Sequence, residues 1–220
     1  MAGLAAELRR RLRGEVRFDA GSRALFASGG SNYRQVPIGV VVPVDADDVA
    51  ETVAVCREHD TPVLPIGADT SLAGQSTNAA VVIDCSKRMN RLVDLDVDGR
   101  RARVEPGLIL DDLRSAAERH HLTFGPDPST HAYCTLGGMI GNNSCGVHSV
   151  TAGRTADNVE ELDVLTYDGL RLRVGATADA DTLVVADGFS CREQIAQATG
   201  RRPVHVAEVA DLSLATREPT

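Results

Sequence analysis

Two glycine-rich segments hold the residue types with the clearest chemistry in this chain of 220 residues. Residues 135–146, TLGGMIGNNSCG, include four glycines, several side chains that can hydrogen-bond locally, and no acid or base. Residues 65–75, PIGADTSLAGQ, have a similar character. Glycine exposes backbone N–H groups and lets a ligand approach the chain closely, as a phosphate or pyrophosphate requires. Two such segments in one small chain predict a dinucleotide site.

Hydrophobic periodicity predicts an α/β or α+β domain around these segments. We expect strands at residues 38–44, 62–67, 79–84, 92–97, 102–105, 159–166 and 170–174. Helices are expected near the N-terminus, after Asp45 as an N-cap, around residues 109–120, and after residue 190. The pairs Asp98-Gly99 and Asp168-Gly169 are typical of tight turns between strands.

Three motifs in order resemble the FAD-binding domain of the vanillyl-alcohol oxidase and p-cresol methylhydroxylase flavoproteins. The most similar branch contains the flavin-binding chain of glycolate oxidase, D-lactate dehydrogenase and the large FAD and iron–sulfur dehydrogenases. Its first motif usually reads Gly-Gly-Gly-Thr-Ser-Leu-Ala-Gly-Gln, whereas residues 67–75 read GADTSLAGQ. The second pattern, Thr-x-Gly-Gly-x(4)-Asn-x-x-Gly, matches residues 135–146, and the third matches Gly-x-Thr-x-Asp-Asn-Val at residues 153–159. The resemblance covers roughly residues 33–175.

The resemblance implies an α+β fold, α/β-like, with FAD bound non-covalently between two lobes of the p-cresol methylhydroxylase type. It divides the chain into an N-terminal helix and lead-in (1–35), lobe 1 (36–124), a partial lobe 2 (125–178) and a short helical C-terminal tail (179–220). Pyrophosphate is expected on the N–H groups of residues 67–71 and 137–141. The residues expected to bind FAD are Pro65, Ile66, Gly67, Ala68, Asp69, Thr70, Ser71, Gln75, Pro126, Asp127, Thr135, Gly137, Gly138, Gly141, Asn142, Asn143, Cys145, Gly146, Gly153, Thr155 and Val159.

Several residues near these motifs allow two interpretations. The carboxylate of Asp69 either points away and caps local N–H groups, which we favour, or faces the phosphates and weakens their binding. Cys145 is either a small residue packed beside the cofactor or a covalent flavin link. His131 and His148 are either ordinary loop histidines or a catalytic base and a flavin partner. Asp127, held between two prolines, is placed near the flavin by the resemblance.

Composition excludes several other classes of protein. A net charge of −8 and an isoelectric point near 5.2 argue against nucleic-acid binding. The five cysteines form no C-x-x-C pair or other metal-ligand spacing, as in a reduced chain without a zinc or iron–sulfur site of its own. No apolar run approaches the length of a transmembrane segment. We therefore expect a cytoplasmic protein that binds no metal.

The C-terminal tail bears on what the chain does. Residues 180–212 resemble the extreme C-terminus of the fused FAD and iron–sulfur dehydrogenases, which predicts a join near residues 175–181; the alternative is an ordinary helical tail. The family's cap and cysteine-rich modules have no counterpart in this sequence, so no catalytic residue is assigned.

The chain is expected to be an FAD-dependent oxidoreductase for 2-hydroxy acids, acting alone, completed by another subunit or self-associated. The alternative is a catalytically incompetent FAD-binding module or deletion remnant. A P-loop nucleotide-binding protein is less consistent with the sequence, because no Gly-Lys-Ser/Thr follows either glycine segment.

Overall fold

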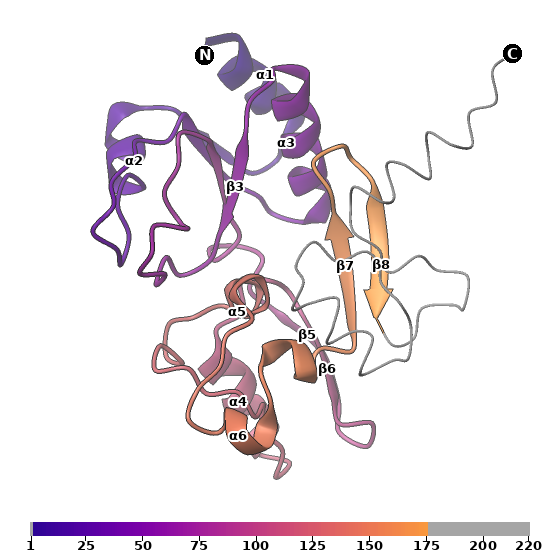
Figure 1. Ribbon diagram of the computed structural model, residues 1–220. Helices are drawn as coiled ribbons and strands as arrows, with labels where there is room; N and C mark the ends of the chain where they lie inside the picture. Colours follow the sequence, from indigo (N-terminus) through magenta and orange to yellow (C-terminus); the bar gives the residue numbers. More distant parts are fainter. Residues whose placement is uncertain (1, 176–220) are drawn as a thin grey trace, which may run out of the picture. The chain divides into compact units, whose positions relative to one another are not determined.

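The computed structural model describes residues 2–175, which fold into two units (Figure 1). Within the described residues, the larger unit consists of residues 2–158 and Leu165–Leu170, and the smaller one of Val159–Val164 and residues 171–175. The predicted C-terminal helix and the whole tail beyond residue 175 lie outside the described residues. Within the part of the chain that is described, no helix is long and apolar enough to cross a membrane.

A four-stranded sheet organises the first part of the larger unit. Its strands lie in the order β1 (Glu15–Arg17), β2 (Gly39–Val42), β4 (Val81–Asp84), β3 (Val63–Ile66). The last three are parallel, and β1 runs antiparallel to β2. Every residue of β2 and β4 is buried, which explains their unbroken runs of β-branched residues. Helices α1 (Ala2–Arg11) and α3 (Ala46–Glu58) lie side by side and share a core with the sheet through Leu8, Val55 and Val41 (Figure 1).

The start of α3 is fixed by two aspartates. Asp45 is the N-cap, as predicted, and its carboxylate accepts hydrogen bonds from the N–H groups of Asp47 and Asp48. Asp48 is 2% exposed and accepts the N–H groups of Arg13 and Gly14 at 3.0 and 2.8 Å, beside a similar bond from Val44. This buried carboxylate therefore ties the turn after α1 to the start of α3.

A second core lies under the later elements of the larger unit. It involves the hairpin of β5 (Leu92–Asp96) and β6 (Arg101–Val104), with α4 (Leu110–Glu118) and α5 (Leu136–Asn142). Its buried residues are Leu108, Leu110, Leu113, Cys134, Leu136 and Met139. This core joins residues on both sides of position 124, and the division into two lobes at that position stays a prediction.

The remaining elements are short. They are α2 (Ala20–Leu25), α6 (Ser149–Ala152), the 3-10 helix η1 (Thr155–Asn158), and the two-stranded sheet of β7 (Glu161–Leu165) and β8 (Arg171–Gly175). The turn that follows β7 belongs to the larger unit, where the Tyr167 hydroxyl donates to the carbonyl of Thr61 at 2.9 Å. The seven predicted strands are confirmed to within two residues at each end, whereas β1 and α2 were not predicted.

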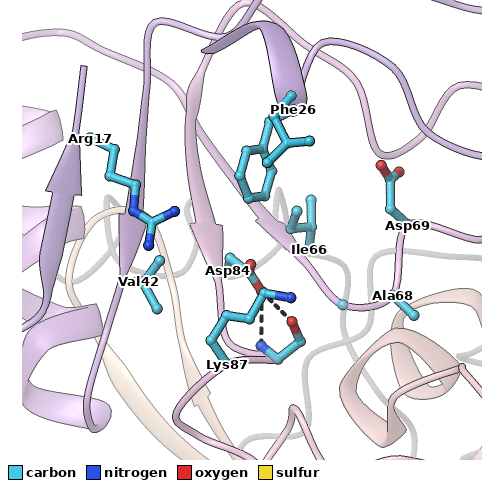
Figure 2. A pocket seen from close by; sticks show the side chains of 11 residues that line it. Arg17, Phe26, Val42, Ile66, Ala68, Asp69, Asp84 and Lys87 are labelled. Atoms are coloured by element: carbon cyan, nitrogen blue, oxygen red, sulfur yellow. Dashed lines mark hydrogen bonds between the residues drawn. The ribbon is translucent and has the colours of Figure 1, made fainter. Parts of the chain in front are cut away.

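The carboxyl ends of β2, β3 and β4 meet at a pocket of about 290 Å³ (Figure 2). Leu25 and Phe26 contribute apolar lining, and residues 66–69, at the start of the first glycine segment, form another wall. Parallel sheets characteristically bind ligands beyond the carboxyl ends of their strands. The sheet therefore directs the first glycine segment toward the edge where a ligand is expected.

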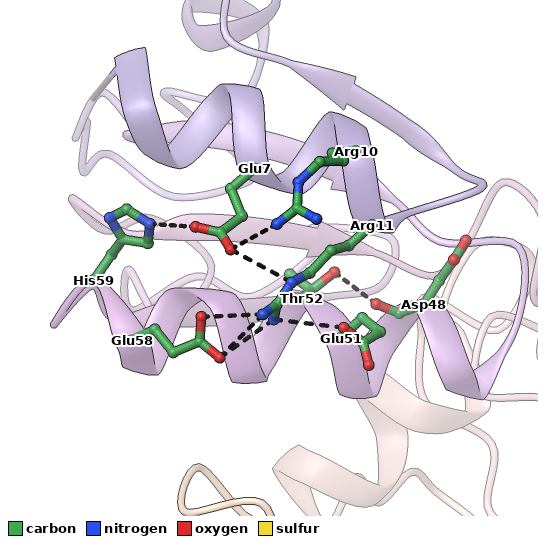
Figure 3. A network of polar contacts seen from close by, with 8 residues as sticks. All are labelled: Glu7, Arg10, Arg11, Asp48, Glu51, Thr52, Glu58 and His59. Carbon is green, nitrogen blue, oxygen red and sulfur yellow. Dashed lines mark hydrogen bonds and ion pairs between the residues drawn. The ribbon is translucent and has the colours of Figure 1, made fainter.

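A network of charged side chains joins α1 to α3 on the surface (Figure 3). The Glu7 carboxylate lies 3.0 Å from Nε2 of His59 and 3.4 Å from the guanidinium of Arg11, which also pairs with Glu58 at 3.2 Å and Glu51 at 3.6 Å. The hydrogen bond with His59 is the main cause that lowers the pKa of Glu7, and the charges of the neighbouring arginines lower it further. The ionised form of Glu7 therefore stabilises the packing of α1 on α3.

We predict that Glu7→Gln lowers the melting temperature at neutral pH, because the variant loses the charge that pairs with His59 and Arg11. The pKa of Glu7 in the folded chain lies below its ordinary value of 4.5, so this stabilisation is fully present above pH 4.5. It is lost as the pH falls through the lowered pKa. Thermal melts across this range should show the two proteins converging in acid. Glu51→Gln, which removes only the 3.6 Å contact, is the matched control. Equal melting temperatures of the Glu7→Gln variant and the parent at pH 7 would contradict the assignment.

Candidate functional site

The two glycine segments meet at Thr135. Gly67 follows β3 directly, and a Cβ atom at this glycine would overlap Oγ1 of Thr135. The same oxygen accepts the N–H group of Gly138 at 3.3 Å, so Thr135 is the N-cap of α5. Thr135 is only 2% exposed. One buried hydroxyl thus fixes the first segment and the second segment against each other.

The second glycine segment is largely helical. We expected free N–H groups at residues 137–141, and this expectation is wrong, because residues 136–142 form α5. The N–H group of Gly137 donates to the carbonyl of Pro106 at 2.8 Å, and that of Met139 donates to the carbonyl of Thr135 at 2.9 Å. Glycine disfavours helix by about 1 kcal/mol relative to alanine. Burial of Leu136 and Met139 in the second core, together with the cap, outweighs that cost.

The glycines of α5 serve two different purposes. A Cβ atom at Gly137 would lie 2.8 Å from Cβ and 2.9 Å from the carbonyl oxygen of Pro106, so this glycine allows the helix to pack. A Cβ atom at Gly138 would meet only Oγ1 of Thr135, at 3.2 Å, and at Gly141 it would meet no atom within 4 Å. Gly138 and Gly141 are three residues apart and share one helix face. That face is open to a ligand that approaches the backbone.

The first glycine segment is an open loop with unused donors. Among the described residues, none accepts a hydrogen bond from the backbone N–H groups of residues 68–72. The next N–H group, of Ala73, donates to Oε1 of Gln75 at 3.1 Å, and Gly74 turns the chain with a φ of +80°. Oγ of Ser76 is buried without a partner among the described residues. A loop with unused N–H donors is suited to an anion such as a phosphate.

Asp69 takes a left-handed backbone conformation in this loop, with a φ of +58°. Asp adopts that conformation more readily than most residues, which explains how it replaces a glycine of the first motif. Its Oδ1 is buried, and no described residue donates a hydrogen bond to the carboxylate. The prediction that Asp69 caps local N–H groups is therefore wrong. The carboxylate points away from Asp84 and Lys87 across the pocket (Figure 2).

The third motif is bound to the end of α5. Asn143 ends the helix in the left-handed conformation, with a φ of +45°, and its Oδ1 accepts the N–H group of Ala156 at 3.0 Å. Buried Thr155 donates its hydroxyl to the carbonyl of Ser144 at 2.7 Å. The structure thus brings Asn143 and Thr155 together. Val159 lies in the smaller unit, and its role stays a prediction.

Asp127 clamps the segment before α5 to the segment after it. Its Oδ1 accepts the backbone N–H group of His148 at 3.0 Å, and its Oδ2 lies 2.5 Å from Nδ1 of the same residue. The bond from the His148 N–H group is the main cause that lowers the pKa of Asp127. Gly146 is needed here, because its Cβ atom would overlap the Asp127 carbonyl. Arg114 also holds the segment before α5, because its guanidinium donates to the carbonyls of Phe124 and Pro126 at 3.2 and 3.0 Å.

The loop histidines contact carboxylates, and the cysteines differ in burial. Nδ1 of His131 lies 2.8 Å from Asp111, so both loop histidines are oriented by a carboxylate. Burial raises the pKa of the Cys56 thiol to about 11, and burial also raises that of Cys85 to about 11, as expected of inert core cysteines. Cys145 is exposed. Catalytic roles for the histidines and a covalent flavin link at Cys145 stay untested predictions.

This arrangement is that of a dinucleotide-binding domain. Parallel strands lead into a loop with unused N–H donors, and a buried threonine fixes that loop against a helix with an open glycine face. The family model described as FAD binding domain matches residues 37–175, and the chain belongs to this family.

Curated relatives and solved structures agree with this membership. The chain is 36% identical over 163 residues to the D-2-hydroxyglutarate dehydrogenase of Pseudomonas putida, covering 73% of this chain and 16% of that protein. It is 36% identical over 151 residues to the glycolate oxidase subunit GlcD of Escherichia coli, covering 68% of this chain and 30% of that protein. An alkyldihydroxyacetonephosphate synthase structure superposes with a TM-score of 0.72 at 21% identity, covering 82% of this chain and 39% of that one.

These comparisons confirm the predicted fold class, an α+β FAD-binding domain of the p-cresol methylhydroxylase type, and FAD as the cofactor. The chain spans less than a third of the length of either curated relative.

We predict that Asp127→Ala loosens the loop after α5, because the N–H group and ring of His148 lose their common acceptor. Amide exchange of residues 146–150 should rise by about tenfold at neutral pH, measured by hydrogen–deuterium exchange. The pKa of Asp127 is lowered, so the clamp of the parent holds at neutral pH and is lost only in acid. Asp111→Ala, which removes the carboxylate beside His131, is the control and should leave these amides protected. Unchanged exchange in Asp127→Ala would show that the clamp does not hold the loop.

Proposed function

We propose that this chain is the flavin-binding part of an oxidoreductase for 2-hydroxy acids and holds FAD non-covalently at the two glycine segments. The observation that carries the site is the run of N–H groups at residues 68–72 that have no acceptor among the described residues. Gly67 holds this run beside the cap of α5. We assign the pyrophosphate to the N–H groups of Ala68 to Ser71. Both the orphaned Ser76 hydroxyl and the open face of α5 fit a polar ligand that approaches the backbone closely.

The second segment contributes by shape and by its last residues. Since the N–H groups of residues 137–141 are used within the protein, we propose that Gly138 and Gly141 make van der Waals contact with the cofactor. Cys145 and Val147 have backbone N–H groups with no acceptor among the described residues, and these can donate to a ligand. The third motif then holds this segment in place through the hydrogen bond from the Thr155 hydroxyl to the carbonyl of Ser144.

The substrate class rests on the relatives' names, which include D-2-hydroxyglutarate dehydrogenase and glycolate oxidase. Bound FAD supplies a hydride acceptor for such a reaction. Oxidation of a 2-hydroxy acid also needs a base near the hydroxyl and a cation for the carboxylate, and no residue of this chain is assigned to either role. A non-catalytic FAD-binding module is the second candidate function, favoured by the small share of each relative that the chain spans.

Exposed apolar side chains next to the two segments favour a covering partner. Leu72, Tyr133, Val147 and Val150 are each at least 70% exposed. Large apolar side chains that gather on a surface often mark an interaction site. We propose that a completing chain or a second copy of this chain covers this region, in the cytoplasm.

We predict that Gly141→Leu weakens FAD binding by at least about tenfold, because the added side chain occupies the open face of α5. The fold should be kept, since a Cβ atom at this position meets no protein atom within 4 Å and leucine favours helix over glycine by up to about 1 kcal/mol. FAD titration by flavin fluorescence and a thermal melt give the two readings.

Gly3→Leu is the matched control, a helical glycine whose Cβ atom would meet only the His59 ring at 4.0 Å. It should bind FAD like the parent. Unchanged FAD affinity in a folded Gly141→Leu protein would remove α5 from the cofactor site.

We also predict that the FAD-loaded chain alone oxidises 2-hydroxy acids poorly or not at all. Without groups that orient the substrate and exclude water, most of the rate enhancement is lost. Flavin absorbance should stay unbleached on anaerobic addition of D-lactate, glycolate or D-2-hydroxyglutarate, while dithionite should bleach it. Saturable bleaching by one of these acids would instead establish the chain as a complete enzyme and exclude the binding-module alternative.

A further inference from the structure

The carboxylate of Asp69 lies in a recess made by Gly29. A Cβ atom at Gly29 would overlap Oδ1 of Asp69 and crowd the rest of its carboxylate. Oδ1 is buried, and none of the described residues donates a hydrogen bond to it. The backbone φ of Gly29 is not in the left-handed region, so its backbone conformation does not require glycine. The space taken by the Asp69 carboxylate is therefore what requires a glycine at position 29.

The segment that carries Gly29 is fixed on the first glycine loop. The N–H group of Gly30 donates to the carbonyl of Asp69 at 2.9 Å. The segment folds back on itself through a hydrogen bond from the Gln35 N–H group to the Ala27 carbonyl, also at 2.9 Å. Farther along the loop, a Cβ atom at Gly74 would lie 2.8 Å from the ring of Tyr33. Residues 27–35 thus contact the loop at both ends, which sets the position of Gly29 against Asp69.

The direction of this carboxylate matters for an anionic ligand. The neighbouring N–H groups of residues 70–72 have no acceptor among the described residues. An aspartate carboxylate readily accepts such N–H groups within a turn, where it would occupy donors that a phosphate needs. It would also repel the phosphate at short range. With the carboxylate turned into the Gly29 recess, it occupies none of these donors, and its charge is directed away from them.

We propose that Gly29 is a positioning residue of the cofactor site, which acts through Asp69 by keeping its carboxylate off the phosphate-binding N–H groups. Asp69 and Gly29 are then one matched pair, in which a glycine outside the loop compensates for an aspartate inside it. This role rests on the proposed binding of FAD at the loop.

The test is Gly29→Ala, alone and combined with Asp69→Gly, which removes both the charge and the acceptor and tolerates the φ of +58°. The new methyl group displaces the end of a flexible side chain, so the fold is kept while the carboxylate leaves its recess. FAD affinity should fall by about tenfold, and the loss should shrink in high salt. In Gly29→Ala/Asp69→Gly, the charge and the acceptor are both gone, and affinity should return to within about threefold of the parent. A role of Gly29 in packing alone would leave the double variant as weak as the single one. Asp69→Gly alone serves as the reference for the double variant.

A measurement without cofactor separates this proposal from the proposed function. The Asp69 carboxyl carbon signal in the NMR spectrum of the FAD-free chain should shift in Gly29→Ala, because its surroundings change. An unshifted signal would show that the Asp69 carboxylate does not lie in the recess at Gly29. Equal FAD affinity of Gly29→Ala and the parent, or no recovery in the double variant, would overturn the role of Gly29. A parent chain that binds no FAD overturns the proposed function, and with it the role of Gly29 but not the recess.

Discussion

The close approach of Gly67 to Thr135 is the contact on which the candidate site depends. It requires a residue without a side chain at the end of β3 and a buried hydroxyl at the start of α5. The hydroxyl is committed to the N–H group of Gly138, which fixes the direction of the helix. β3 is held in register by β4, and this fixes the position of the loop that follows β3. Two weak structural elements, a glycine loop and a seven-residue helix, thereby become a preorganised surface.

Glycine content alone does not tell which glycines serve a ligand. Gly137 and Gly146 are crowded by backbone atoms of Pro106 and Asp127, so a side chain at either position would disturb the fold itself. Gly141, in contrast, has open space where its side chain would be. The same residue type thus answers two physical demands, close packing inside the protein and close approach from outside. In the proposed site, only the second demand concerns the cofactor.

The sequence predicted the strands well because their signal is local. Runs such as those of β2 and β4 are buried on both faces, and a short β-branched run between turn residues has few alternatives. The helix α5 was missed because two adjacent glycines argue against helix, while the burial of Leu136 and Met139 that favours it is a tertiary effect. Thr135 before an apolar residue is a capping signal that could have indicated the helix start.

The candidate site could also be predicted only as far as local sequence signals reach. The motifs identified which segments come together, since their order and spacing are properties of the sequence. They could not identify which N–H groups remain free, because the partners of Gly137 and Met139 depend on tertiary packing or on the helix itself. Nor could they give the pairing of Asp127 with His148, which are 21 residues apart, or the direction of the Asp69 carboxylate.

The proposed site consists mainly of backbone donors, and this separates cofactor binding from catalysis in the chain. Backbone N–H groups bind phosphate without acid or base chemistry, so a chain can hold the cofactor firmly while it contributes little to the reaction. The acidic side chains near the two segments are directed elsewhere: Asp127 holds His148, and Asp69 lies against Gly29. In the proposed site, their negative charge is thereby directed away from the phosphate-binding N–H groups, in a chain whose net charge is −8. If FAD is bound as proposed, binding and catalysis make separate demands on the sequence, and the described residues would meet the first through shape and through N–H donors that have no acceptor among them.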